Sequence, residues 1–112
     1  MAFLASFQRQ IQLTDYTNSL QQRLTGLTET KLSLTESITE ITKNISDIGD
    51  IDSPSVAKLK ARKAELENYD RQLDIEMQKI QTQLQAASTE LQSAKQMTQQ
   101  NIQSSFSYNI GN

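Results

Sequence analysis

The chain contains 112 residues with a formal net charge of −2, and 36% of them are hydrophobic and 5% aromatic. This apolar content is below the roughly 45–50% of an average globular domain. The chain also has no excess of basic residues of the kind that would indicate a surface for nucleic acid or an anionic membrane. Cysteine and histidine are absent, which excludes disulfides and thiol chemistry, removes the commonest general base and metal ligand, and predicts no catalytic, cofactor or metal site.

The first residues, 1–7, are mildly apolar but lack the basic stretch that begins a signal peptide. If the protein is exported, we therefore expect a route without a cleaved signal. No apolar run approaches the roughly 18 residues that a membrane-spanning helix needs, so we expect no membrane span. These features leave two compartments open, secretion without a cleaved signal and the cytoplasm.

A heptad pattern predicts a first helical arm over about residues 3–48. Apolar residues recur at alternating steps of three and four, which is typical of the a and d positions of a coiled coil. The d positions are Leu13, Leu20, Leu27, Leu34, Ile41 and Ile48, and the a positions are Thr17, Leu24, Lys31, Ile38 and Ile45. Gly26 falls on the solvent face, where it weakens a helix by about 1 kcal/mol relative to Ala without ending it.

A turn is predicted over residues 49–53, where Gly49 is followed closely by Pro54. Ser53 is a side-chain cap, and Pro54 suits the first helical position because its missing N–H is not needed there. Three aspartates, Asp47, Asp50 and Asp52, gather in this segment. Their spacing differs from that of an EF-hand loop, so we interpret them as solvated turn residues near a helix N-terminus.

The second arm is predicted over about residues 54–103, with residues 104–112 as a C-terminal tail. Its d positions are Leu59, Leu66, Leu73, Ile80, Ala87 and Ala94, and its a positions are Val56, Lys63, Asp70, Met77, Leu84, Leu91 and Thr98. The polar face of this arm is charged near the turn and becomes rich in Gln and Ser further along the chain.

The heptads of the two arms independently predict the same centre for their pairing. In an antiparallel coiled coil, an a residue shares a layer with a d residue of the other arm. Ile48 with Val56 and Leu13 with Leu91 are both equidistant in sequence from Asp52, as are the layers between them. We therefore predict an all-α fold, a single helical-hairpin domain over residues 1–112, made of two long helices in an antiparallel coiled coil.

Two charged residues interrupt the apolar seam of this hairpin. Lys31 and Asp70 lie one layer apart in the predicted register and can form an ion pair. One interpretation is that the pair fixes the register at some cost in stability, as polar a-position residues can. The other is that both side chains reach from a narrow seam into solvent.

The end of the hairpin where the termini meet is predicted to be its interaction surface. Five of the six aromatic residues lie near the termini, and the seam there contains small or polar residues, such as Thr17 opposite Ala87. The predicted partner-binding residues are Phe3, Leu4, Phe7, Ile11, Met97, Ile102, Phe106 and Tyr108. The alternative is a local hydrophobic plug that closes a fraying hairpin. We favour association, because a lone two-helix coiled coil buries little surface.

Two segments resemble parts of type III secretion needle subunits, which are helical hairpins with a proline-containing turn. They are Ser53-Pro54-Ser55-Val56-Ala57-Lys58-Leu59 and Asn101-Ile102-Gln103-Ser104-Ser105-Phe106. In length and central turn the chain is also similar to the WXG family of secreted bacterial hairpins, although it has no Trp. Both resemblances are architectural, and they imply bacterial secretion and assembly.

Taken together, these features predict a non-enzymatic structural or interaction protein. It would act through the terminal end of the hairpin, as a homo-oligomer or with a helical protein partner, and as an exported bacterial subunit. No nucleic acid and no small-molecule substrate is expected. The alternative is an intracellular coiled-coil adaptor or chaperone-like binding module. Localisation of the protein to culture supernatant or to the cell discriminates the two.

Overall fold

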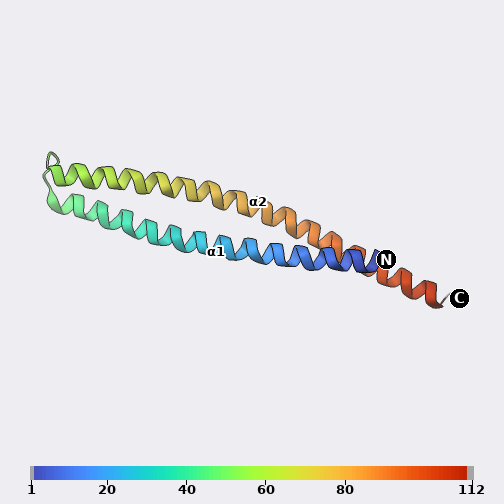
Figure 1. The fold of residues 1–112 in the computed structure, drawn as a ribbon. Helices are drawn as coiled ribbons and strands as arrows, with labels where there is room; N and C mark the ends of the chain where they lie inside the picture. The colour runs from blue at the N-terminus through green and yellow to red at the C-terminus, as the bar shows by residue number, and fades with distance from the viewer. Residues whose placement is uncertain (1, 111–112) are drawn as a thin grey trace. The chain divides into compact units, whose positions relative to one another are not determined.

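The computed structural model describes the backbone of residues 2–110 and the side chains of residues 2–104. It contains helix α1 (Ala2–Ile48) and helix α2 (Pro54–Ile110), joined by a short turn (Figure 1). No strand occurs among residues 2–110. The predicted all-α fold with two long helices in a hairpin is therefore confirmed. Helix α2 continues to Ile110, beyond the end near residue 103 that we expected.

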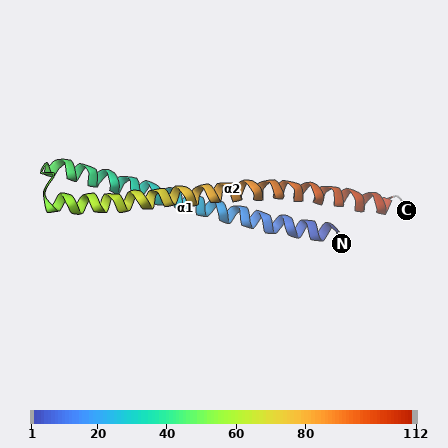
Figure 2. The same ribbon diagram turned by 90° about the horizontal axis from the view of Figure 1, so that it is seen from above.

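Contacts between the helices divide the chain into two compact units, which are described separately. The apex unit comprises Leu24–Lys79 and contains the turn. The terminal unit combines Met1–Arg23 with Ile80–Asn112, and the description covers its residues 2–23 and 80–110. Each unit contains one segment of α1 and one of α2. In the apex unit these segments cross in the view of Figure 2, as the helices of a coiled coil do.

Burial follows the predicted heptads. In α1, all side chains from residue 3 to residue 45 that are not exposed lie at a or d positions or at their continuation toward the N-terminus, Phe3, Ser6 and Gln10. In α2, Val56 and Ile80 are each only 1% exposed. The other buried apolar residues are Leu13, Leu20, Leu34, Leu73, Ala87 and Ala94. The stability of each unit therefore comes from a narrow apolar seam between its two helical segments.

One predicted seam residue lies outside the seam. Ile48 was expected at a d position, but its side chain is 42% exposed. It is the last residue of α1, and the chain turns away directly after it. Consequently no further helical turn of α1 covers this side chain.

The turn satisfies its own backbone groups. Gly49 adopts a positive φ of 74°, the left-handed conformation that commonly ends a helix and that favours glycine. Its N–H donates to the Ile45 carbonyl at 3.4 Å. Asp50 Oδ1 accepts the N–H of Asp52 at 3.2 Å, and Ser53 Oγ accepts the N–H of Ser55 at 3.1 Å. Ser53 is thus the N-cap of α2, as the sequence predicted.

The charged layer of the apex unit is an ion pair across the seam. Lys31 Nζ lies 3.3 Å from Asp70 Oδ1 and also pairs with Asp74. The Asp74 carboxylate, together with Asp70, raises the pKa of Lys31 above its usual value of 10.5. Asp70 Oδ1 is buried and makes no hydrogen bond within the part of the chain that the structure describes. The nearby positive charge of Lys31 therefore compensates a carboxylate that water reaches poorly.

Substitution of the two described glycines by Ala should have opposite effects. At Gly49 the positive φ makes Ala unfavourable by about 1 kcal/mol. At Gly26 an added Cβ meets nothing within 4 Å, so Gly26→Ala should stabilise α1 by about 0.5–1 kcal/mol. Urea unfolding followed by circular dichroism measures both changes. Equal effects of the two substitutions would contradict the assignment of Gly49 to the turn.

The charged layer should reduce stability while it fixes the register. Replacement of both partners in Lys31→Leu/Asp70→Leu should raise the melting temperature by several degrees, because an apolar layer replaces two half-buried charges. Lys31→Leu alone should lower it, because Asp70 then lacks its compensating charge. Thermal melts of the two variants and the wild type at one protein concentration test whether the melting temperature rises in the double variant and falls in the single variant. A double variant less stable than the wild type would show that the ion pair stabilises the hairpin more than an apolar layer does.

Candidate interaction surface of the terminal unit

The seam of the terminal unit combines apolar residues with several small and hydroxyl-bearing ones. Ser6, Thr17 and Thr98 are buried, with exposures of 6%, 8% and 6%, and Ala87 and Ala94 are buried beside them. Ser6 Oγ donates to the Phe3 carbonyl at 3.0 Å, and Thr98 Oγ1 donates to the Ala94 carbonyl at 2.9 Å. The hydroxyls thus satisfy their hydrogen bonds on their own helices and remain compatible with burial.

Two polar contacts join the arms of this unit. Asn101 Nδ2 donates to Ser6 Oγ at 3.1 Å. On one side of the seam, the guanidinium of Arg9 pairs with the carboxylate of Glu90, both of them half-exposed. Ser6 and Asn101 lie within one layer of the pairing predicted about Asp52, so these contacts agree with the predicted register.

Several large apolar side chains of the terminal unit lie outside its seam. Leu4 is 57% exposed, Ile11 47% and Phe7 43% on α1. On α2, Met97 is 56% exposed and Ile102 49%. The unit thus buries Leu13, Leu20 and Ile80 in its seam but leaves a second set of large apolar side chains half exposed toward its open end. Such an arrangement is typical of a surface that another molecule covers.

Part of this apolar set lines a groove between the two arms. The groove has a volume of ≈ 520 Å³ and is lined by Phe3, Phe7, Gln10, Gln92, Lys95, Gln96, Thr98, Gln99 and Ile102. The rings of Phe3 and Phe7 stack, with centroids 5.9 Å apart and planes inclined by 21°. Phe7, Lys95 and Ile102 all occupy e positions of the heptads, and e positions face each other across an antiparallel pair.

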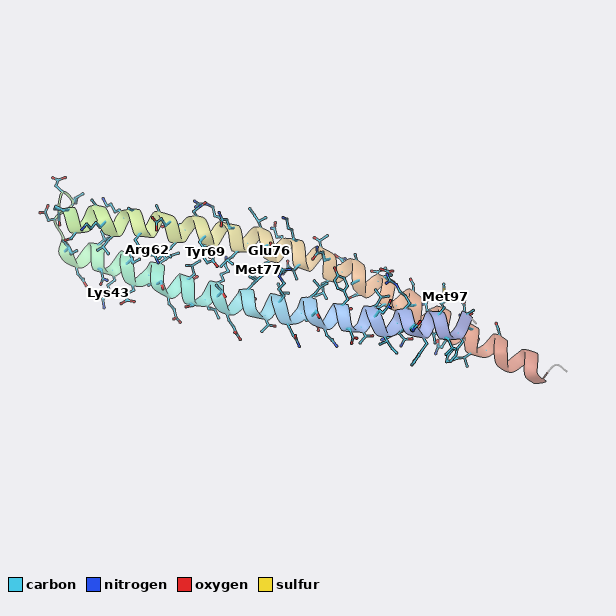
Figure 3. All side chains as sticks on the ribbon, in the orientation of Figure 1. Lys43, Arg62, Tyr69, Glu76, Met77 and Met97 are labelled. Atoms are coloured by element: carbon cyan, nitrogen blue, oxygen red, sulfur yellow. The ribbon has the colours of Figure 1, made fainter. Side chains whose placement is uncertain are left out.

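The structure brings together some of the predicted partner-binding residues and separates others. Phe3, Phe7 and Ile102 line the groove. Leu4 and Ile11 lie three and four residues from Phe7 on the same flank of α1. Met97, labelled in Figure 3, occupies a g position, on the other side of the seam with Arg9 and Glu90. The side chains of Phe106 and Tyr108 lie outside the described residues.

Charge is scarce in the terminal unit. Only five of the 24 charged residues of the sequence belong to it: Arg9, Asp15, Arg23, Glu90 and Lys95. By contrast, 13 of the 15 glutamines do. Sequence reasoning did not assign Lys95 and the glutamines to the site. The e position of Lys95 and the b positions of Gln92 and Gln99 in the second heptad were the signal that could have identified these three residues.

The groups at this surface are apolar side chains and neutral amides. Among residues 2–104, no group of three or more carboxylates is placed to hold a metal ion. No helix among the described residues is long and apolar enough to cross a membrane. What the groove offers is aromatic rings, aliphatic side chains and neutral amides, with the single ammonium group of Lys95. These groups suit an apolar protein surface that carries few charges.

Comparison with known proteins assigns no family to this surface. No protein-family model matches the chain, and searches of curated proteins and of solved structures return no match. The resemblance to secretion subunits therefore remains an expectation from the sequence.

The close approach of the arms should tolerate no larger residue at Ala87. Ala87 is 4% exposed, whereas its neighbour Ala86 is exposed. We expect Ala87→Leu to destabilise the terminal unit by about 1–3 kcal/mol through overpacking, and Ala86→Leu to change its stability by less than about 0.5 kcal/mol. Hydrogen exchange of amides in residues 80–104 measures both effects. Similar effects of the two substitutions would show that residue 87 does not face the seam.

Proposed function

We propose that the protein is a non-enzymatic structural subunit that associates with helices through its terminal unit. The associated helices belong to further copies of the chain or to a helical partner protein. The observation that carries this proposal is the outward placement of large apolar side chains in the terminal unit, where Leu4, Phe7 and Ile102 are about half exposed. Beside them, Ser6, Thr17 and Thr98 occupy buried seam positions.

Association is supported by the energetics of this exposed surface. Each half-exposed large apolar side chain leaves roughly 100 Å² accessible to water, and burial yields roughly 25 cal/mol per Å². The scarcity of charge in the terminal unit supports the same conclusion, because the centres of protein interfaces are depleted of charged residues and enriched in aromatic residues and Met. The terminal unit combines both properties.

Export belongs to the proposal and is supported by the resemblance to secreted bacterial hairpins. The second segment of that resemblance, residues 101–106, lies in the terminal unit. Recovery of the uncleaved protein from culture supernatant supports export. Strict retention in the cell favours an intracellular adaptor instead.

The apex supports a second candidate function, that of an adaptor that grips a partner with the turn. Ile51 is 75% exposed and Ile48 42% exposed. Beside them, Ile45, Ile51 and Val56 contribute to a groove of ≈ 250 Å³. Exposed apolar residues at the tip of a hairpin can serve as a binding site, and this surface is separate from the groove of the terminal unit.

Matched substitutions distinguish the two candidates. Phe7→Glu places a charge in the terminal groove, and Ile51→Glu places one on the turn. If the terminal unit is the association surface, Phe7→Glu should weaken assembly by roughly tenfold or more, while Ile51→Glu leaves it unchanged. Assembly is measured by sedimentation velocity of the protein alone and of the protein in extracts of its own cells.

The reverse result, loss of assembly in Ile51→Glu only, would favour the adaptor. Circular dichroism of both variants serves as the control for folding. Neither substitution touches a fully buried residue, because Phe7 and Ile51 are both exposed.

A further inference from the structure

We infer that the groove side of the terminal unit binds the same surface of a second copy of the chain, in a two-fold symmetric contact. This surface, called the aromatic flank, consists of Phe3, Leu4, Phe7, Ile11 and Ile102 with the amides around the groove. The inference rests on the proposed function and names its partner. It also assigns the contact to one side of the seam.

The heptad positions place the aromatic flank on the side of the seam where the e positions of the two arms face each other. Phe7 and Ile102 occupy e positions on opposite arms and line one groove. Leu4 and Ile11 occupy b positions, one helical turn before and after Phe7, and so extend the apolar stripe along α1. The stripe ends with Thr14, whose hydroxyl bonds to the Gln10 carbonyl at 2.8 Å. The flank therefore extends over about two helical turns of α1.

The other side of the seam lacks such a patch. There, Arg9 and Glu90 neutralise each other in an ion pair. Met97 and Tyr16 are exposed on that side, with exposures of 56% and 47%. The ion pair places two charges on this surface, and burial of such a pair against a partner costs desolvation energy that its mutual attraction repays poorly.

The area of the flank matches what a modest dimer needs. Leu4, Phe7, Ile11 and Ile102 are between 43% and 57% exposed, which leaves roughly 100 Å² on each. Two flanks face to face therefore bury roughly 800 Å² from these side chains alone. The surrounding Gln92, Gln96 and Gln99 bring the contact close to the lower limit of about 1,200 Å² for specific interfaces.

The polar groups of the flank are suited to a copy of itself. Gln92, Gln96 and Gln99 line the groove, and each carboxamide both donates and accepts hydrogen bonds. A surface with such groups can pair with its own copy, whereas a surface of charges of one sign would repel it. Lys95 is the one charged residue that lines the groove. Two copies therefore meet with little electrostatic opposition.

Apart from Ile48 and Ile51 at the turn, apolar residues elsewhere in the described chain do not form a comparable patch. In the apex unit, Leu32, Tyr69 and Ile75 are also exposed, but they occupy b, g and f positions and are not spaced as one stripe. Single exposed apolar residues are normal on protein surfaces. This contrast makes Ile75→Glu a matched control, because Ile75 is as exposed as Leu4, at 57%.

Opposite charges at residue 7 test the symmetric contact. Near a two-fold axis, residue 7 of one copy lies close to residue 7 of the other. Phe7→Glu alone and Phe7→Lys alone should each weaken dimerisation by roughly tenfold or more, because like charges meet in an apolar contact. An equal mixture of the two variants should recover dimers, since the introduced carboxylate and ammonium groups then pair.

Sedimentation equilibrium at protein concentrations of tens of micromolar measures dimerisation of the two single Phe7 variants and of their equal mixture. Met97→Glu and Ile75→Glu serve as controls that should dimerise like the wild type. Leu4→Glu should weaken the dimer as the single Phe7 variants do, which guards against a purely local effect at Phe7. Sodium chloride should change the affinity little, because few charges meet at the contact. Circular dichroism verifies that each variant keeps its helices.

Several outcomes would overturn the inference, and they separate it from the proposed function. A wild-type chain that stays monomeric excludes the second copy but leaves a helical partner at the terminal unit. A wild-type dimer that Met97→Glu disrupts and Phe7→Glu does not would move the contact to the other side of the seam. A dimer that only Ile51→Glu disrupts would overturn both the inference and the proposed function. Failure of the mixed variants to recover dimers would show that the contact is not two-fold symmetric about the flank.

Discussion

The packing of a-position side chains against d-position side chains across α1 and α2 is the interaction on which the rest of the structure depends. It buries Leu34, Val56 and Leu73 in the apex unit and Leu13 and Ala87 in the terminal unit. An isolated helix is marginally stable in water, so the stability of α1 and α2 comes mainly from the burial of this seam. The seam also sets the register. A shift of one residue along either helix would remove Phe7 and Ile102 from the same groove and Lys31 from Asp70.

Both units pack a-position side chains against d-position side chains, but the units differ in their seam residues and in the residues on their surfaces. The apex unit contains 19 of the 24 charged residues and an ion pair across its seam. The terminal unit has Ser, Thr and Ala at several seam positions and carries a further set of large apolar side chains on the outside. Threonine hydroxyls of the first arm donate to the carbonyl four residues earlier, as Thr28 does at 2.9 Å, and so find a partner on their own helix. Charge is therefore concentrated in the apex unit, and exposed apolar surface beside the seam in the terminal unit.

Much of the fold can be predicted from residue spacing, because few folds other than a coiled coil are compatible with a heptad pattern. The two arms, the cap at Ser53, the turn at Gly49 and the pairing of Lys31 with Asp70 could all be predicted this way. The second partner of Lys31, Asp74, could not, since it depends on the reach of a flexible side chain. The exposure of Ile48 depends on where α1 ends. Grouping the apolar residues by closeness to the termini also placed Met97 with Phe7, although their heptad positions lie on opposite sides of the seam.

The central claim is that one molecule folds back at the turn so that its own two helices pair about Asp52. Spin labels at Asn18 and Ala86, which are exposed and equidistant from Asp52, test this claim most directly through dipolar distance measurement. Labelled protein is diluted with an excess of unlabelled protein, so that only distances within one molecule are detected. The account predicts a separation of roughly 20 Å, because paired helix axes lie about 10 Å apart and the labels add to this. A separation of roughly 100 Å, as expected for one straight helix through both positions, would contradict it.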